Sequence, residues 1–336
     1  MSKQLKLLFT LILLSTSTFA ESTPVSSKPA KAEQYNVINI AGHTVPVVAE
    51  GLYDRFRSNP PLDVINEESP DIDLSWFRTL KKKRVDIGFD SYSPNFYYEN
   101  SRVSIIFTAD IERLRELMPE AVLDQVQPIS VWPGRGLIAL TAYSYQYCDN
   151  DSYKEITISI VTTKPRSLNL GPISLARETM SKDYWGYVLK LPVDTELARV
   201  RGLVGYNLPK WLTEINYKET DSSIVVEIAD VKTGAVDVSL TTNKLDDIST
   251  DVGFVKNNFI NLDHQGQLST GYSVSRQLAH ASSFSSDDVN LRLGDGSLST
   301  FIKSLNLGRV IKYEYIPSFQ SALYAPNALD PKIDTE

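Results

Sequence analysis

The stretch Ile156-Thr157-Ile158-Ser159-Ile160 alternates strictly between branched apolar and hydroxyl side chains. Successive side chains of a β-strand point to opposite faces, so this stretch predicts a strand with one buried face and one polar face. Similar short runs, rich in branched and aromatic residues and bounded by turn residues, recur at 102–108, 137–147, 184–191, 223–229, 236–241 and 309–316. Such a series predicts a mainly β protein, an antiparallel sandwich or barrel with a few short helices.

Helical periodicity is weaker than the strand pattern. Apolar residues at helical spacing run from Ile111 to Met118, and Asp110 stands where an N-cap is expected. A second short helix is expected over 297–305. A barrel of this size can enclose a ligand cavity, which favours a small-molecule function and leaves the chemistry open.

The composition excludes several classes of function. The chain has 336 residues, 42% of them hydrophobic, and a net charge of -7, which argues against a nucleic-acid-binding protein. A single cysteine, Cys148, excludes an intramolecular disulfide, and the three histidines show no metal-ligand spacing. A Cys/His metal site is therefore not expected, and a site made of carboxylates stays open. Nucleotide-binding, serine-hydrolase and zinc-protease motifs do not occur in the sequence.

The N-terminal segment has the residue pattern of a signal peptide. Lys3 and Lys6 precede an apolar run over 7–14, and small residues lead to a cleavage point after Ala20. The run is shorter than the roughly 20 apolar residues that cross a bilayer. We therefore expect an exported protein, periplasmic or secreted, with no stable membrane anchor after cleavage.

The remaining chain divides by composition. We expect a signal peptide over 1–20, a flexible lead-in over 21–36, an N-terminal extension over 37–95, a main domain over 96–320 and a C-terminal tail over 321–336. The basic run over 81–84 is interpreted as a solvated helix end.

Lys210 has apolar neighbours in sequence, since it lies between Pro209 and Trp211 and follows Leu208, with no acid until Glu214. Such a lysine can extend its ammonium to water, and the local sequence by itself favours this interpretation. The alternative is a desolvated amine that loses its proton and attacks a ketone.

The spacing Gly202-x6-Pro209-Lys210 resembles the catalytic segment of the acetoacetate decarboxylase family. Met118-Pro119-Glu120 and Tyr153-Lys154-Glu155 resemble two further family segments, and all three follow in the family's order over roughly 96–316. The resemblance implies an acetoacetate decarboxylase-like antiparallel barrel or cone, a homo-oligomer, and no metal or organic cofactor. It also implies that Lys210 forms the Schiff base and that Glu155 lies in the active site.

The sequence departs from the family at three places. Leu203-Val204 stand where members commonly have Arg-Glu, Trp211 replaces a second lysine, and no acid occurs over 136–147, where a second glutamate is expected. Arg102 lies close to, though displaced from, the position of a family arginine. The expected substrate pocket comprises Tyr153, Tyr206, Leu208, Pro209, Trp211 and Arg102.

Taken together, the sequence predicts a lysine Schiff-base lyase that decarboxylates an acetoacetate-like β-keto acid. Glu155 would position the substrate or assist proton transfer. Two alternatives remain open: a Schiff-base aldolase or dehydratase, and an exported small-molecule-binding protein that keeps the barrel but has lost catalysis.

Overall fold

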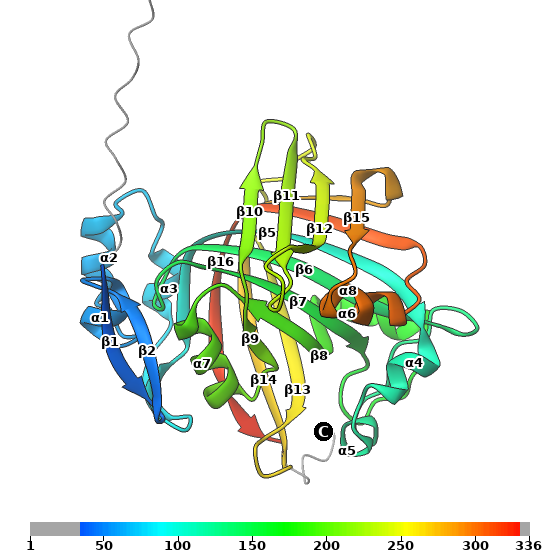
Figure 1. Cartoon of the computed structure of the whole chain (residues 1–336), viewed down its shortest axis with the longest axis horizontal. Coiled ribbons are helices and arrows are strands. Elements are labelled where there is room, and N and C mark those ends of the chain that lie inside the picture. Colours follow the sequence, from blue (N-terminus) through cyan, green and yellow to red (C-terminus); the bar gives the residue numbers. More distant parts are fainter. Residues whose placement is uncertain (1–33, 330–336) are drawn as a thin grey trace, which may run out of the picture. The chain divides into compact units, whose positions relative to one another are not determined.

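An eight-stranded sheet dominates the structure, a computed structural model that describes residues 34–329 (Figure 1). Its strands lie in the order β13 (Gly253–Leu262), β14 (Leu268–Ser283), β16 (Val310–Ala328), β5 (Asn95–Asp110), β6 (Arg135–Cys148), β7 (Tyr153–Thr162), β8 (Asp183–Val193) and β9 (Lys210–Leu212). Parallel pairing between β8 and β13 closes the first seven of these into a barrel. The predicted mainly β barrel is confirmed. The predicted signal peptide lies outside the described residues.

A four-stranded sheet covers one side of the barrel wall (Figure 1). Its strands are β10 (Ile215–Glu219), β11 (Ser223–Ala229), β12 (Val236–Asn243) and β15 (Val289–Leu293). Ile156, Ile158 and Ile160 of β7 share one apolar core with side chains of this sheet. The alternating hydroxyl residues of β7 therefore face the inside of the barrel, here called the lumen.

Short helices connect the strands. They are α1 (Leu52–Phe56), α2 (Leu62–Glu68), α3 (Ser75–Thr79), α4 (Ile111–Glu116), α5 (Glu120–Leu123), α6 (Pro172–Ser181), α7 (Glu196–Tyr206) and α8 (Ser297–Ser304). The two predicted helices are confirmed as α4 and α8, and the Asp110 side chain caps α4 by accepting from the Arg113 N–H at 3.0 Å. No helix within 34–329 is both long and apolar enough to span a membrane.

The N-terminal extension packs onto the barrel rather than standing apart. It adds the hairpins β1 (Tyr35–Ile40) with β2 (His43–Val48) and β3 (Lys83–Asp86) with β4 (Asp90–Ser93) to α1, α2 and α3. Val45 and Tyr53 bury their side chains against Leu197 and Val200 of α7. Strand β1 thus starts inside the expected lead-in, and β16 continues past the expected boundary at 320.

The interpretation of the basic run over 81–84 as solvated is wrong for Lys82, whereas Lys81, Lys83 and Arg84 are exposed. The Lys82 ammonium is buried and forms an ion pair of 2.5 Å with Asp149, whose side chain is fully buried. Asp149 also accepts from the Phe96 N–H at 2.6 Å and from the Tyr98 hydroxyl at 2.7 Å. The buried ion pair of Lys82 therefore links the extension to the barrel, and the side chain is not solvated.

Candidate active site

Lys210 and Glu155 meet inside the barrel. Lys210 begins β9, where it pairs with Leu191 of β8, and Glu155 of β7 pairs with Val193 of the same strand. The two side chains thus approach each other across β8, with 2.5 Å between Lys210 Nζ and Glu155 Oε2. They are 7% and 10% exposed, so the ion pair is shielded from solvent. Removing either partner of such a buried ion pair is destabilising, because the other charge is then left buried without a counter-charge.

Gly202 explains the spacing of the lysine segment. Helix α7 ends at Asn207, which has the left-handed φ of 53°, and the Leu208 N–H then donates to the Gly202 carbonyl at 3.1 Å. The chain therefore turns back and lays the Lys210 stem across Gly202. A Cβ at position 202 would overlap Cδ and Cε of Lys210 and lie 3.1 Å from its Cγ. Only glycine leaves room for the lysine in this position.

Three tyrosines surround the ion pair. Lys210 Nζ lies 5.5 Å from the centre of the Tyr153 ring, and the Tyr153 and Tyr97 hydroxyls are 3.1 Å apart. The Tyr145 hydroxyl makes a long contact of 3.5 Å with Glu155 Oε1. Burial raises the pKa of all three phenols well above the usual value, so they stay neutral donors.

Arg102 shares the lumen with this pair. Arg102 of β5 pairs with Tyr143 of β6, which pairs with Glu155 of β7, so the three side chains form one row across the wall. Arg102 is only 5% exposed and its guanidinium lies 5.4 Å from the centre of the Phe319 ring. Within 34–329 no carboxylate forms an ion pair with it, and its Nε has no hydrogen-bond partner. A buried cation in this state favours an anionic ligand.

A second lumen carboxylate, Glu314, was missed by the sequence analysis. Glu314 of β16 pairs with Ser104, two residues from Arg102 on β5, and the Lys312 ammonium binds it at 2.7 Å. Burial alone would raise the pKa of Glu314, but Lys312 and Arg102 outweigh it and lower the pKa. The alternation in Lys312-Tyr313-Glu314-Tyr315 could have predicted this position. Tyr313 faces the core outside the barrel, so the charged residues that alternate with the tyrosines face the lumen.

The other predicted pocket residues are divided between the two faces of the barrel wall. Leu208 and Pro209 line a different cavity. Tyr206 and Leu208 are buried in a small apolar cluster with Leu191, which pairs with Lys210. Trp211 faces the opposite side of β9 and packs against the core between the barrel and the four-stranded sheet. Tyr153 and Arg102 thus share the lumen with Lys210 and Glu155, Tyr206 and Leu208 pack beside the lysine segment, and Trp211 lies on the other face.

Potential metal ligands do not gather in the described part of the chain. Within 34–329 no three histidine, cysteine or acidic side chains lie close enough to hold a metal ion. Cys148 is buried, and its thiol donates to the Asp151 carbonyl at 2.8 Å. Burial raises the pKa of the Cys148 thiol well above its usual value, which makes it a structural residue.

Comparison with solved structures identifies the fold. Acetoacetate decarboxylase of Legionella pneumophila superposes with a TM-score of 0.52 and 10% identity, over 72% of this chain and 89% of that chain. The enduracididine biosynthesis enzyme MppR complexed with pyruvate gives 0.45 and 12%, over 71% of this chain and 91% of that chain. An acetoacetate decarboxylase-like enzyme from Sphingomonas wittichii RW1 gives 0.41 and 14%, over 71% and 94%.

The chain therefore has the acetoacetate decarboxylase-like fold, as its sequence predicts. Neither a protein-family model nor a curated protein sequence matches it.

Proposed function

We propose that this protein is a lysine Schiff-base lyase that decarboxylates a β-keto acid. The observation that carries the proposal is the buried Lys210–Glu155 pair, held in the lumen of an acetoacetate decarboxylase-like barrel. Arg102, which forms no ion pair with a described carboxylate, lies in the same row. An amine can form the imine, a carboxylate can accept and return its proton, and a guanidinium can bind the carboxylate of a keto acid.

The first half of the reaction forms an imine. Lys210 must be neutral to attack, and Glu155, 2.5 Å from its nitrogen, can accept the proton that the ammonium releases. The amine then adds to the ketone carbon. Glu155 returns the proton to the resulting hydroxyl, which leaves as water, and the nitrogen lone pair completes a protonated iminium.

The second half breaks the carbon–carbon bond. The electron pair of the bond to the carboxylate moves towards the iminium nitrogen, carbon dioxide leaves, and an enamine remains. A proton from a lumen acid then adds to the enamine carbon. Water adds to the regenerated iminium, the ketone is released, and Lys210 recovers its amine. Arg102 would hold the substrate carboxylate before it departs.

Glu314 favours a second candidate, a Schiff-base aldolase or dehydratase. The same iminium acidifies the protons on the neighbouring carbon, and an ionised carboxylate in the lumen can remove one of them. The resulting enamine would add to an aldehyde or expel a leaving group. A third candidate, an exported binding protein without catalysis, needs only Arg102 and the lumen. Export through the N-terminal signal is part of this proposal.

Borohydride trapping separates the three candidates. Protein incubated with acetoacetate or pyruvate is reduced with borohydride, and the modified peptide is identified by mass spectrometry. We expect a reduced adduct on Lys210 and release of carbon dioxide from acetoacetate. An adduct without carbon dioxide release favours the aldolase or dehydratase. Binding of these acids without any adduct favours the binding protein, and an adduct on other lysines alone refutes the mechanism.

A further inference from the structure

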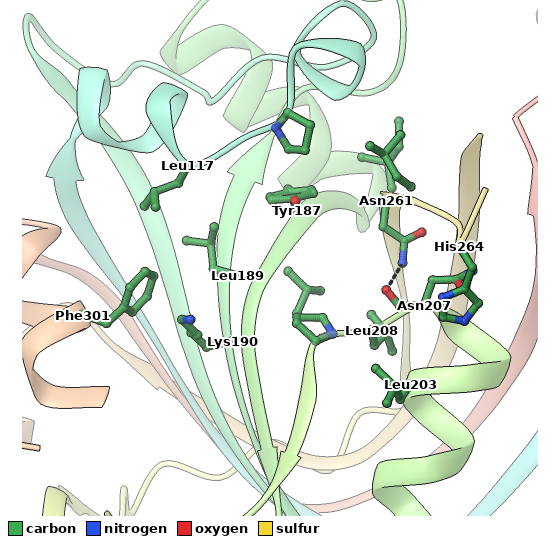
Figure 2. Close-up of a pocket in the computed structure, with 15 residues that line it drawn as sticks. Leu117, Tyr187, Leu189, Lys190, Leu203, Asn207, Leu208, Asn261, His264 and Phe301 are labelled. Carbon is green, nitrogen blue, oxygen red and sulfur yellow. Dashed lines mark hydrogen bonds between the residues drawn. The ribbon is translucent and has the colours of Figure 1, made fainter. Parts of the chain in front are cut away.

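A second cavity lies where the barrel wall opens. The strands β8 and β13 pair from Asp183 to Gly186 and from Lys256 to Phe259, and beyond these residues they separate. The cavity has a volume of about 510 Å³ and is lined by the separated strand ends, the Leu208–Pro209 turn and α8 (Figure 2). This volume lies within the roughly 300–1,000 Å³ typical of small-molecule sites.

The lining of this cavity differs from that of the lumen site. Lys190 of β8 lines it and pairs with Ile158, which faces the core outside the barrel. Lys210 faces the lumen from the other side of the same wall and, like Glu155, does not line the cavity. The two lysines therefore lie on opposite faces of the wall, although Leu208 of the lining packs with Leu191, which pairs with Lys210.

Lys190 gives the cavity its chemistry. Its ammonium lies 4.7 Å from the centre of the Phe301 ring and 6.0 Å from that of Trp211. No carboxylate of the described chain forms an ion pair with it, and no described lining residue is acidic. The Asn261 amide in the wall is already engaged, since it donates to the carbonyls of Tyr206 and Asn207 at 2.9 and 3.0 Å. Among the lining side chains, Lys190 is thus the lysine available to a ligand, and His264 adds an imidazole to the wall.

The walls supply apolar surface around this cation. Figure 2 shows Leu117, Leu189 and Phe301 on the side of Lys190, with Leu203 and Leu208 across the cavity. Aromatic faces stabilise the ammonium in the absence of an anion. An apolar chamber with one unpaired cation fits a ligand with a hydrophobic body and one negative group.

We propose that this cavity is a second ligand site, specific for small organic anions with an aromatic or branched aliphatic body. Lys190 pairs with the carboxylate, sulfonate or phosphate of the ligand, and the leucines and Phe301 enclose its body. The site does not depend on Schiff-base chemistry, so it stands or falls separately from the lyase function.

Two matched fluorescent probes test the site. Anilinonaphthalene sulfonate has an apolar body and one anion, whereas N-phenylnaphthylamine has the same body without the charge. We expect the full chain to bind one sulfonate probe, and Lys190→Met to weaken it about tenfold or more through loss of the charge-assisted contact. The neutral probe should bind Lys190→Met as it binds the wild type, which shows that the cavity is intact.

Three controls locate the probe. Lys256→Met removes another lysine that lies over an aromatic ring, 4.6 Å from Tyr272, and should not change either affinity. Leu117→Trp fills the cavity and should weaken both probes. The double variant Lys210→Met with Glu155→Gln should bind the sulfonate probe as the wild type does.

Three outcomes overturn the inference. The sulfonate probe fails to bind, or it binds Lys190→Met and the wild type equally, or it is lost in the Lys210/Glu155 double variant, which would place it in the lumen. None of these outcomes bears on borohydride trapping at Lys210.

Discussion

Gly202→Ala tests whether the glycine in the lysine segment exists to seat Lys210. The added methyl would overlap Cδ and Cε of Lys210, which belong to a flexible side chain, so the lysine and not the helix is expected to move. Alanine in a helix interior gains about 1 kcal/mol over glycine. Separating a buried ion pair and leaving one charge unpaired costs about 3–5 kcal/mol. The cost of separating the ion pair exceeds the gain in helix propensity, so the variant should be about 2–4 kcal/mol less stable than the wild type.

The effect on reactivity should exceed the effect on folding. A displacement of about 1 Å at a reacting group lowers rates by about 100-fold, so borohydride trapping of acetoacetate on Lys210 should slow by at least this factor. Urea unfolding measures the stability in parallel. Gly205→Ala is the matched control in the same helix, because its methyl would meet Ile87 Cδ1 at 2.6 Å and not the lysine. Trapping at the wild-type rate in Gly202→Ala, or equal slowing in both variants, would refute the reasoning.

Three further predictions test other buried charges. Arg102→Leu should weaken keto acid binding about ten- to 100-fold and leave trapping of the neutral ketone acetone unchanged, whereas equal loss with both would rule out carboxylate recognition. Burial raises the pKa of Glu178 from 4.5 to about 8, so the folded state binds the proton more tightly than the unfolded state. The free energy of unfolding should therefore fall as pH rises from about 5 to 8, by ~5 kcal/mol at most. Glu178→Gln should flatten this pH dependence in urea titrations, and an unchanged dependence contradicts the assignment. Lys82→Met leaves Asp149 buried without its cation and should cost about 3–5 kcal/mol in urea unfolding, while the exposed Arg84→Met should cost about 1 kcal/mol or less, and similar costs would contradict the burial of Lys82.

Local patterns in the sequence predict the parts of the fold that depend on local chemistry. The alternation at 156–160 predicts both the strand and its two environments, because a strand between a core and a lumen must alternate. Asp110 predicts the start of α4, since a carboxylate at that position satisfies an N–H of the first turn. The spacing from Gly202 to Lys210 marks the lysine segment, and the structure supplies the steric reason for the glycine.

Contacts between distant segments leave no such local pattern. Lys82 reads as a surface lysine because its partner Asp149 lies on another element, 67 residues away. Glu314 lies near Arg102 only because β16 pairs with β5, a strand far away in the sequence. Helix α7 was not predicted because its buried residues include Arg201, Gly202 and Gly205, which break an apolar stripe.

The N-terminal extension, whose purpose the sequence does not reveal, bears on the site through α7. Arg201 is buried, and its guanidinium donates to the Tyr53 hydroxyl, Ser91 Oγ and Asn95 Oδ1 at 3.2–3.3 Å. The next residue, Gly202, receives the Lys210 stem. Neighbouring helix positions thus hold the extension and the lysine, so a shift of α7 away from the extension would alter the space in which Lys210 lies. The extension therefore belongs to the framework that sets the position of the amine, and the barrel strands supply its carboxylate partner.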